Sequence, residues 1–523
     1  MNSIVEAVFR HAMEQSDAPA ILFEEQVINY RQLRADVTRC ADALRRAGLQ
    51  AGERVALFLG NEPAFVMAYL GTHLAGGIVV LVNTQYRQVE LSHILNDAAV
   101  RFCVTSPDGW TTLRPLDVPA LERVILVEDT DPAVQPQPAT ASAKESGTVA
   151  QSVAFTEFLA SGSPEAAFAM PQSETPALIG YTSGTTGLAK GALLLHRNLL
   201  ANIRAVTGAW HWISSDRLLL VLPLFHAHGL MVGMHGTLFT GGSVLLRQKF
   251  EAADVLSTLK HDRAITLFFG VPTMYVRLLA EAERAGAPAR PLRLYVSGSA
   301  PLSAQLFTNF ERVFGQPILE RYGMTETIMN LTNPYEGERR AGTVGGPFPG
   351  QEARVVDVQT RQFMPDGEIG EIEIRGPHVF SGYWNRPEAT AEAFAADGWF
   401  KTGDLGWRSS DGYYTITGRA RELIISGGYN IYPREIEDVL ALHPAVAEVA
   451  VIGQPDPEMG EKVIAAIVLA PGQNADPAEL IAFCRLRLAS YKKPRSISFV
   501  DILPRNALGK VQKHLLAAQL PAE

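Results

Sequence analysis

The feature that most restricts the fold is an alternation of short apolar runs and helical patterns from the start of the chain to about residue 400. The run GERVALFLG (52–60) is typical of a buried strand, and GIVVLVN (77–83) is typical of the next one. Between them a helix is predicted, with Asn61 as its cap, Pro63 in its first turn and Gly76-Gly77 after its end. Such units favour parallel sheets covered by helices on both faces. The sequence therefore predicts an α/β fold with a large N-terminal domain of mostly parallel sheets.

The composition changes near residue 418, and beyond it the chain predicts a smaller α+β unit. A helix beginning at Pro433, the strands VAEVAVIG and KVIAAIVLA, a helix opened by Asp476 and the strand SISFVDIL follow one another. We therefore place the domains at 1–418 and 419–523. Residues 129–175 are rich in Pro, Ala, Ser, Thr and Gln, and we expect an exposed insertion there, with a short amphipathic piece at VAFTEFLA.

Charge and cysteine content exclude several classes of protein. The 523 residues carry 46 Lys+Arg and 55 Asp+Glu, a net charge of −9, which argues against a dedicated binder of nucleic acid or anionic membranes. The cysteines Cys40, Cys103 and Cys484 lie far apart, so neither a disulfide framework nor a structural zinc site is expected. No apolar stretch approaches the ~20 residues of a membrane helix, and the start lacks a secretion signal. A soluble cytoplasmic protein is expected, and its oligomeric state stays open.

The densest chemical signal in the chain is a glycine-rich segment, Tyr181-Thr-Ser-Gly-Thr-Thr-Gly-Leu-Ala-Lys190-Gly191. Its glycines allow close backbone approach, its hydroxyls can donate to anionic oxygens and Lys190 adds a cation, which are the parts of a phosphate cradle. Judged by composition alone, a segment like this is more often an ordinary polar loop between a strand and a helix. A Walker A loop is disfavoured, because Ala189 and Gly191 stand where glycine and a hydroxyl residue would flank its lysine.

This segment, YTSGTTGLAKG, resembles the signature loop of the acyl-adenylate-forming superfamily of acyl-CoA synthetases, luciferases and adenylation domains. Further motifs of that superfamily follow in its order: LPLFHAHG (222–229), YVSGSAPL (295–302), ERYGMTE (320–326), TGD (402–404), GRARELI (418–424) and PRNALGK (504–510). The resemblance covers nearly the whole chain except roughly residues 129–175. It implies an adenylation domain with a small mobile C-terminal domain, and ATP, Mg²⁺ and CoA as its ligands.

The resemblance implies roles for individual residues at the nucleotide site. Tyr322 should stack on adenine, Asp404 should accept bonds from the ribose hydroxyls, and Arg419 should bind ribose or α-phosphate oxygen. Glu326, together with Thr185, should hold Mg²⁺, because a hard divalent cation prefers oxygen ligands. Taken singly, these charged residues would more often be solvated surface groups. The residues expected to bind ATP are Thr182, Ser183, Gly184, Thr185, Thr186, Gly187, Lys190, Ser299, Ala300, Pro301, Tyr322, Gly323, Met324, Thr325, Asp404 and Arg419.

The resemblance also implies residues for the change between the two half-reactions. Lys510 should reach the α-phosphate and the carboxylate during adenylation. His226 should separate the ATP channel from the thiol channel, and Gly427-Gly428 should line the pantetheine tunnel, although a glycine pair is by default an ordinary turn. The hinge reads Gly418-Arg-Ala-Arg421-Glu, where the superfamily often has GRxKD or GRxDD. Because Arg421 keeps a positive charge, we expect hinge function to survive.

The segment GVPTMYVRLL (270–279) bears on which acid is activated. From the pattern alone, Arg277 fits a solvated helix face about as well as a pocket. The stretch resembles malonyl-CoA synthetases, whose GVPT-x-Y-x-R arrangement sets the arginine against the distal carboxylate, for which a planar guanidinium is the natural partner. Ser297, Ala227 and Met329 are expected to complete the pocket, and the small Ala227 leaves room for methylmalonate.

The sequence therefore predicts an ATP-dependent acid–thiol ligase that converts malonate, ATP and CoA into malonyl-CoA, AMP and pyrophosphate. A short-chain or aromatic acyl-CoA ligase of the same superfamily is the nearest alternative, and it is distinguished by whether Arg277 faces the pocket. A non-catalytic nucleotide-binding protein is a remote alternative, against which Glu326, Asp404 and Lys510 argue.

Overall fold

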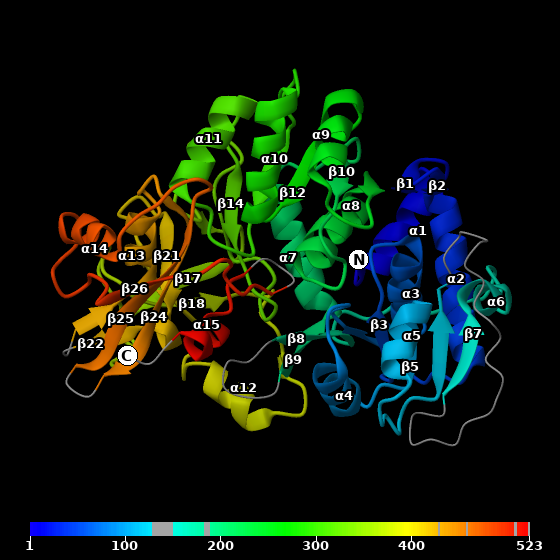
Figure 1. The fold of residues 1–523 in the computed structure, drawn as a ribbon. Helices are drawn as coiled ribbons and strands as arrows, with labels where there is room; N and C mark the ends of the chain where they lie inside the picture. Colours follow the sequence, from blue (N-terminus) through cyan, green and yellow to red (C-terminus); the bar gives the residue numbers. More distant parts are fainter. Residues whose placement is uncertain (128–149, 183–188, 427–428, 457–458, 507–509, 521–523) are drawn as a thin grey trace.

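The computed structural model describes residues 1–127, 150–182, 189–426, 429–456, 459–506 and 510–520. Figure 1 shows sheets and helices in the blue-to-green part of the chain and a further sheet, in orange, near the C-terminus. The α/β fold class predicted from the sequence is confirmed. The predictions for Ser183, Gly184, Thr185, Thr186, Gly187, Gly427 and Gly428 lie outside the described residues.

The first sheet has eight strands in the order β19-β9-β8-β4-β3-β5-β6-β7. Strands β3 to β8 are parallel to one another, and β9 and β19 add antiparallel pairs at the β8 edge. The two apolar runs that the sequence marks as strands form β3 and β4 at the centre of this sheet. The strands are β3 (Arg54–Phe58), β4 (Ile78–Leu81), β5 (Phe102–Thr105), β6 (Arg123–Leu126), β7 (Gln151–Ala154), β8 (Pro176–Thr182), β9 (Lys190–Leu195) and β19 (Gly382–Tyr383).

The second sheet has nine strands in the order β16-β15-β14-β13-β12-β10-β11-β1-β2. Its six central strands are parallel, so their carboxyl ends lie at one edge of the sheet. The strands are β1 (Pro19–Phe23), β2 (Gln26–Asn29), β10 (Arg217–Leu220), β11 (Ser243–Leu246), β12 (Leu267–Gly270), β13 (Leu294–Ser297), β14 (Leu319–Tyr322), β15 (Leu331–Thr332) and β16 (Gly346–Pro347).

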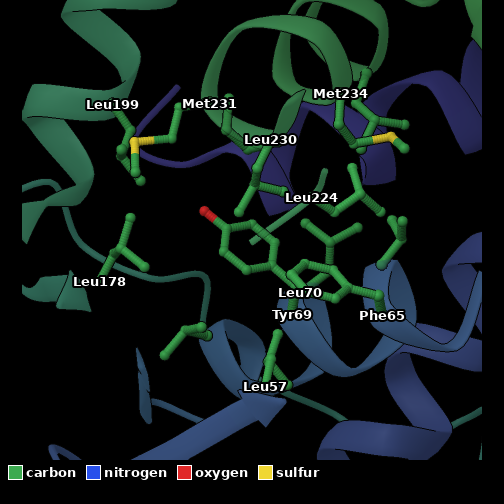
Figure 2. Packing of buried hydrophobic residues seen from close by; sticks show 14 of the residues in the cluster. Leu57, Phe65, Tyr69, Leu70, Leu178, Leu199, Leu224, Leu230, Met231 and Met234 are labelled. Atoms are coloured by element: carbon green, nitrogen blue, oxygen red, sulfur yellow. The ribbon is translucent and has the colours of Figure 1, made fainter. Parts of the chain in front are cut away.

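The helices of this part cover the two sheets, and α3 lies fully buried between them. Every residue of α3 is buried, as expected for a helix that is apolar on all sides. Figure 2 shows α3 packed against side chains from β3, β8, α7 and the π-helix η1. The helices are α1 (Ile4–Glu14), α2 (Tyr30–Arg46), α3 (Pro63–Leu74), α4 (Gln88–Asp97), α5 (Pro107–Leu113), α6 (Phe155–Ala160), α7 (His196–Ala209), η1 (His228–Met234), α8 (His235–Thr240), α9 (Ala252–His261), α10 (Pro272–Ala285), α11 (Ala304–Phe314) and α12 (Pro387–Ala393).

The expectation of an exposed insertion over 129–175 is wrong for residues 151–160. Strand β7 pairs in parallel with β6 and extends the first sheet by one strand. Helix α6 follows at once and buries Phe155 and Phe158 in the main core, next to α2. These two phenylalanines lie on one face of the short amphipathic piece that the sequence marks at VAFTEFLA. The polar composition of the surrounding segment gave no sign that this face packs into the core.

Two smaller sheets complete the molecule. The third is antiparallel, with the order β17-β18-β20-β21, and its strands are β17 (Glu352–Val356), β18 (Gly370–Arg375), β20 (Phe400–Arg408) and β21 (Tyr414–Arg419). The fourth contains β22 (Ile424–Ser426), β23 (Tyr429–Ile431), β24 (Val446–Asp456), β25 (Gly460–Leu469) and β26 (Ser496–Phe499). It is accompanied by α13 (Pro433–Leu440), α14 (Pro477–Arg485) and α15 (Lys513–Gln519).

The change from the third sheet to the fourth takes place over a few residues. Strand β21 ends at Arg419, a 3₁₀ turn covers Ala420–Glu422, and β22 begins at Ile424. The expected boundary at 418/419 thus falls at the end of β21, and the expected hinge residue Arg421 lies in the turn. Among the described residues, no helix is long and apolar enough to span a bilayer.

Candidate active site

Four of the predicted motifs meet at the carboxyl edge of the second sheet. Ser297, the last residue of β13, is level with Gly270 of β12 on one side and Glu320 of β14 on the other. The segments that follow β10, β12, β13 and β14 therefore leave the sheet side by side. In open parallel sheets ligands bind beyond this edge, where loops and helix N-termini converge.

A cluster of three side chains, the buried Asp404 and the half-buried Tyr322 and Arg419, joins the second sheet to the third. The Tyr322 hydroxyl donates to Oδ2 of Asp404 at 2.5 Å, and Nε of Arg419 lies 2.7 Å from Oδ1 of Asp404. Asp404 and Arg419 are also direct partners across β20 and β21. Burial raises the pKa of Tyr322 well above its usual value, so the phenol is a neutral donor. Both carboxylate oxygens of Asp404 keep lone pairs that could accept hydrogen bonds from the hydroxyls of a ribose.

A second cluster gathers around Tyr383 of β19. The Tyr383 hydroxyl donates to Oε1 of the buried Glu326 at 3.0 Å, and Nζ of Lys190 lies 5.3 Å from the centre of the Tyr383 ring. Burial raises the pKa of Glu326. At the base of the glycine-rich segment, the Thr182 hydroxyl donates to the carbonyl of Lys190 at 3.3 Å and so joins the two described ends. A Cβ at Gly180 would lie 2.6 Å from the Thr325 side chain, so β8 ends against the ERYGMTE segment.

The donor set around Glu326 fits Mg²⁺ bound together with a phosphorylated ligand. Among the described residues no three His, Cys, Asp or Glu side chains are grouped to hold a metal ion. Mg²⁺ commonly binds through one or two carboxylates with the remaining positions taken by water and substrate phosphates. A single buried carboxylate that, like Lys190, contacts Tyr383 matches that pattern.

The first residue of the glycine-rich segment, Tyr181, is held by residues that the sequence did not mark. The Tyr181 hydroxyl donates to Oδ2 of Asp97 at 2.7 Å, and Nη2 of Arg386 lies 2.6 Å from Oδ1. Trp384 Nε1 also donates to the Asp97 carbonyl, at 3.3 Å. These residues come from α4, β8 and the segment after β19, and no local pattern connects them.

The C-terminal tail brings Lys510 to the same region. Lys510 is half-buried, and its pKa is lowered by burial first and then by the charges of Arg419 and Arg421. The carboxylates of Asp404 and Glu422 act on it in the opposite direction. The charges of Asp404 and Arg419 thus both act on Lys510, and its role in adenylation stays a prediction.

His226, the residue expected to separate the ATP channel from the thiol channel, follows β10 in a tight turn. The backbone N–H of His226 donates to the Pro223 carbonyl at 3.2 Å, and burial lowers the pKa of His226 to about 4. Asn61 holds this turn: its Oδ1 accepts from the Leu224 N–H at 2.8 Å and its Nδ2 donates to the Leu222 carbonyl at 2.9 Å. Asn61 was expected to cap α3, but the N-cap is Glu62, whose side chain makes no capping bond to the first turn.

The residues expected around the acid differ in burial. Ala227, Ser297 and Met329 are buried, and the Ser297 hydroxyl has no hydrogen-bond partner among the described residues. Arg277 lies one turn into α10 and is exposed, so the enclosed setting expected for it is not found. Ser299, directly after this edge, has a φ of 69°, which is uncommon for a residue with a side chain and is frequent at ligand sites.

Comparison with known proteins identifies the class of enzyme. The family model described as AMP-binding enzyme matches residues 8–384, and the AMP-binding enzyme C-terminal domain matches residues 435–510. The chain therefore belongs to the AMP-binding enzyme family.

Full-length relatives define its activity more closely. The chain is 37% identical to a sulfoacetate–CoA ligase of Cupriavidus necator, over 96% of this chain and 95% of that protein. It is 33% identical to a malonate–CoA ligase of Arabidopsis thaliana, over 99% of this chain and 88% of that protein. ATP-bound MatB from Rhodopseudomonas palustris superposes with a TM-score of 0.89 at 37% identity, over 99% of both chains. The protein is an AMP-forming acyl-CoA ligase that uses an acid, ATP and CoA.

Proposed function

We propose that the acid is malonate and that the protein is a malonyl-CoA synthetase, with methylmalonate as a further substrate. The observation that carries the proposal is an exposed arginine, Arg277, one turn into α10. This helix follows β12, whose last residue Gly270 is level with the buried Ser297. Among the described residues Arg277 makes no ion pair, so a second carboxylate on the substrate could take that place. The likeness to a malonate–CoA ligase and to MatB supports the same choice.

The proposed reaction has two half-reactions. A malonate oxygen attacks the α-phosphorus of ATP, the bond to the β-phosphate oxygen breaks, and pyrophosphate leaves. Lys510 stabilises the charge that develops on the α-phosphate, while Tyr322 and Asp404 hold the nucleoside. Glu326 would hold Mg²⁺, which when bound supplies positive charge to the phosphate oxygens.

In the second half-reaction the C-terminal domain, residues 419–523, turns about Arg421 and withdraws Lys510. The CoA sulfur, having lost its proton, attacks the malonyl carbonyl carbon, and the bond to AMP breaks. His226 and Gly427-Gly428 are proposed to border the thiol path. Among these, His226 is largely neutral at pH 7 because burial lowers its pKa to about 4.

The test is pyrophosphate release over a panel of malonate, methylmalonate, butyrate and benzoate. Malonate is expected to give the highest kcat/KM, and a higher value for butyrate or benzoate would replace malonate by the short-chain or aromatic alternative.

Arg277→Leu tests the arginine itself. Because Arg277 is exposed, solvent screening limits its pairing to about 1 kcal/mol, so malonate kcat/KM should fall about five-fold. Arg284→Gln is the matched control, since Arg284 is an exposed arginine on the same helix, paired with Glu281. A loss above about 10²-fold would instead mean that substrate binding encloses Arg277.

A further inference from the structure

Helix α4 contacts both described ends of the glycine-rich segment through two side chains on one of its faces. Figure 1 shows this helix, in blue, beside the ends of β8 and β9. Near the end of β8, the Tyr181 hydroxyl donates to Oδ2 of Asp97 at 2.7 Å. One turn earlier in the helix, Nε2 of His93 donates to the Ala189 carbonyl at 2.8 Å, directly before Lys190. Because residues four apart share a helix face, a single helix holds both ends.

The last residue of α4 also reaches the segment that follows β19. Nη2 of Arg386 lies 2.6 Å from Oδ1 of Asp97, and Nε1 of Trp384 donates to the Asp97 carbonyl at 3.3 Å. The backbone N–H of Trp384 donates in turn to the Gly191 carbonyl at 2.7 Å. The end of α4 therefore joins β8, β9 and the segment after β19 at one point.

The position of Asp97 is unfavourable for the helix itself. A carboxylate in the last turn of a helix faces the negative end of the helix dipole, and Asp97 is the last residue of α4. Its side chain is only 10% exposed, and each of its carboxylate oxygens has a partner, Tyr181 or Arg386. These contacts, and not the stability of the helix, account for an acid at this place.

The two ends of the segment determine where its lysine lies relative to the Glu326 carboxylate. Tyr383, the residue before Trp384, donates to Glu326, and Nζ of Lys190 lies 5.3 Å from the centre of the Tyr383 ring. A side chain that is held in place before its ligand arrives loses less conformational freedom on binding. The contacts of α4 can therefore increase the affinity for a ligand that α4 does not touch.

We propose that Asp97 and His93 are positioning residues that fix Lys190 for the phosphates of ATP. They act through the ends of the glycine-rich segment, Tyr181 and Ala189, and make no contact with the nucleotide themselves. The inference goes beyond the proposed function, because it concerns ATP and does not depend on which acid is activated.

The kinetic test uses the full chain with the acid that gives the highest kcat/KM. Asp97→Ala should raise the KM for ATP about 10–10²-fold, as expected for the loss of hydrogen bonds to a charged group, and leave the KM for CoA unchanged. His93→Ala removes one neutral hydrogen bond and should raise the KM for ATP about 2–10-fold. An unchanged KM for ATP in both variants would overturn the inference.

Asp42→Ala is the matched control. Asp42 lies on α2, its side chain is 15% exposed, and it pairs with Arg46 at 2.7 Å, so it resembles Asp97 in burial and pairing. This variant should keep the KM for ATP of the wild type. A rise as large as that of Asp97→Ala would mean that the loss of any sheltered ion pair has this effect, and would contradict a specific role for α4.

Inhibition by AMP separates positioning for the phosphates from general damage to the site. AMP has the nucleoside and the α-phosphate but lacks the β- and γ-phosphates. Asp97→Ala should therefore leave the inhibition constant of AMP, and the rate of thioester formation from supplied acyl-AMP, nearly unchanged. An equal weakening of ATP and AMP would mean a structural role only and would overturn the inference.

Tyr181→Phe is a milder variant for the case that Asp97→Ala folds poorly. It removes one hydroxyl, keeps the ring, and should raise the KM for ATP about 2–10-fold. In Asp97→Ala the Tyr181 hydroxyl has already lost its acceptor, so adding Tyr181→Phe should change the KM for ATP little further. Full additivity of the two changes would mean that the residues act independently, which would contradict the proposed connection.

This inference and the malonate assignment can fail separately. If the wild type prefers butyrate to malonate and Asp97→Ala raises the KM for ATP, malonate is the wrong acid and the role of α4 stands. If the wild type prefers malonate and the KM for ATP is unchanged in Asp97→Ala and His93→Ala, the malonate assignment stands and the role of α4 is wrong.

Discussion

Removal of the Lys510 ammonium tests whether the described arrangement is the adenylating one. Lys510 lies half-buried near the Asp404–Arg419 pair, where it can act on the phosphate that Arg419 is expected to bind. One preorganised donor to a developing negative charge contributes about 2.7–4 kcal/mol, or about 10²–10³ in rate. We expect Lys510→Ala to lose that factor in the first half-reaction.

The assay measures the two half-reactions separately. Malonate-dependent exchange of pyrophosphate into ATP reports adenylation and should fall about 10²–10³-fold in Lys510→Ala. Thioester formation from supplied malonyl-AMP and CoA should stay near the wild-type rate, since the proposed mechanism withdraws the lysine in that step. Lys249→Ala is the control, because Lys249 is an exposed lysine paired with Glu251.

The same residue predicts a pH dependence. Burial and the nearby charges of Arg419 and Arg421 lower the pKa of Lys510, so its charged form is lost as pH rises, below the pH at which a free lysine deprotonates. The rate of pyrophosphate exchange should therefore decline on the alkaline side, while the rate of thioester formation from malonyl-AMP does not.

Two results with Lys510→Ala would refute the reasoning. One is an equal loss of rate in both half-reactions, and the other is an unchanged rate of pyrophosphate exchange.

Two further predictions concern the hinge and the core. Arg421→Pro fixes φ near −65°, so one half-reaction should be lost and the other spared in the assays above. An equal loss of both half-reactions in a folded variant would mean that the hinge lies elsewhere. Burial lowers the pKa of His196 to about 4, so stability is full above pH 6.5 and falls as pH drops toward 4. The melting temperature of His196→Gln should fall less steeply over that range than that of the wild type, and an identical slope would contradict this.

Much of the local structure could be predicted from the sequence, because it depends on neighbours along the chain. The apolar run 54–58 is a central strand, and Pro433 begins α13 as expected. Asp476 caps α14 through its bond from the Ala478 N–H at 2.7 Å. The resemblance also supplied residues that the structure brings together, namely Tyr322, Asp404, Arg419 and Lys510.

Only the tertiary structure decided which side chains are enclosed and what they face. The sequence marked Arg277 as a pocket residue, and the structure leaves its side chain exposed. Nor did the sequence show that Asp97 joins Tyr181 to Arg386, residues far apart in the chain. Periodicity and caps are set within one or two turns of backbone, whereas burial and pairing depend on distant segments that meet only in the folded protein.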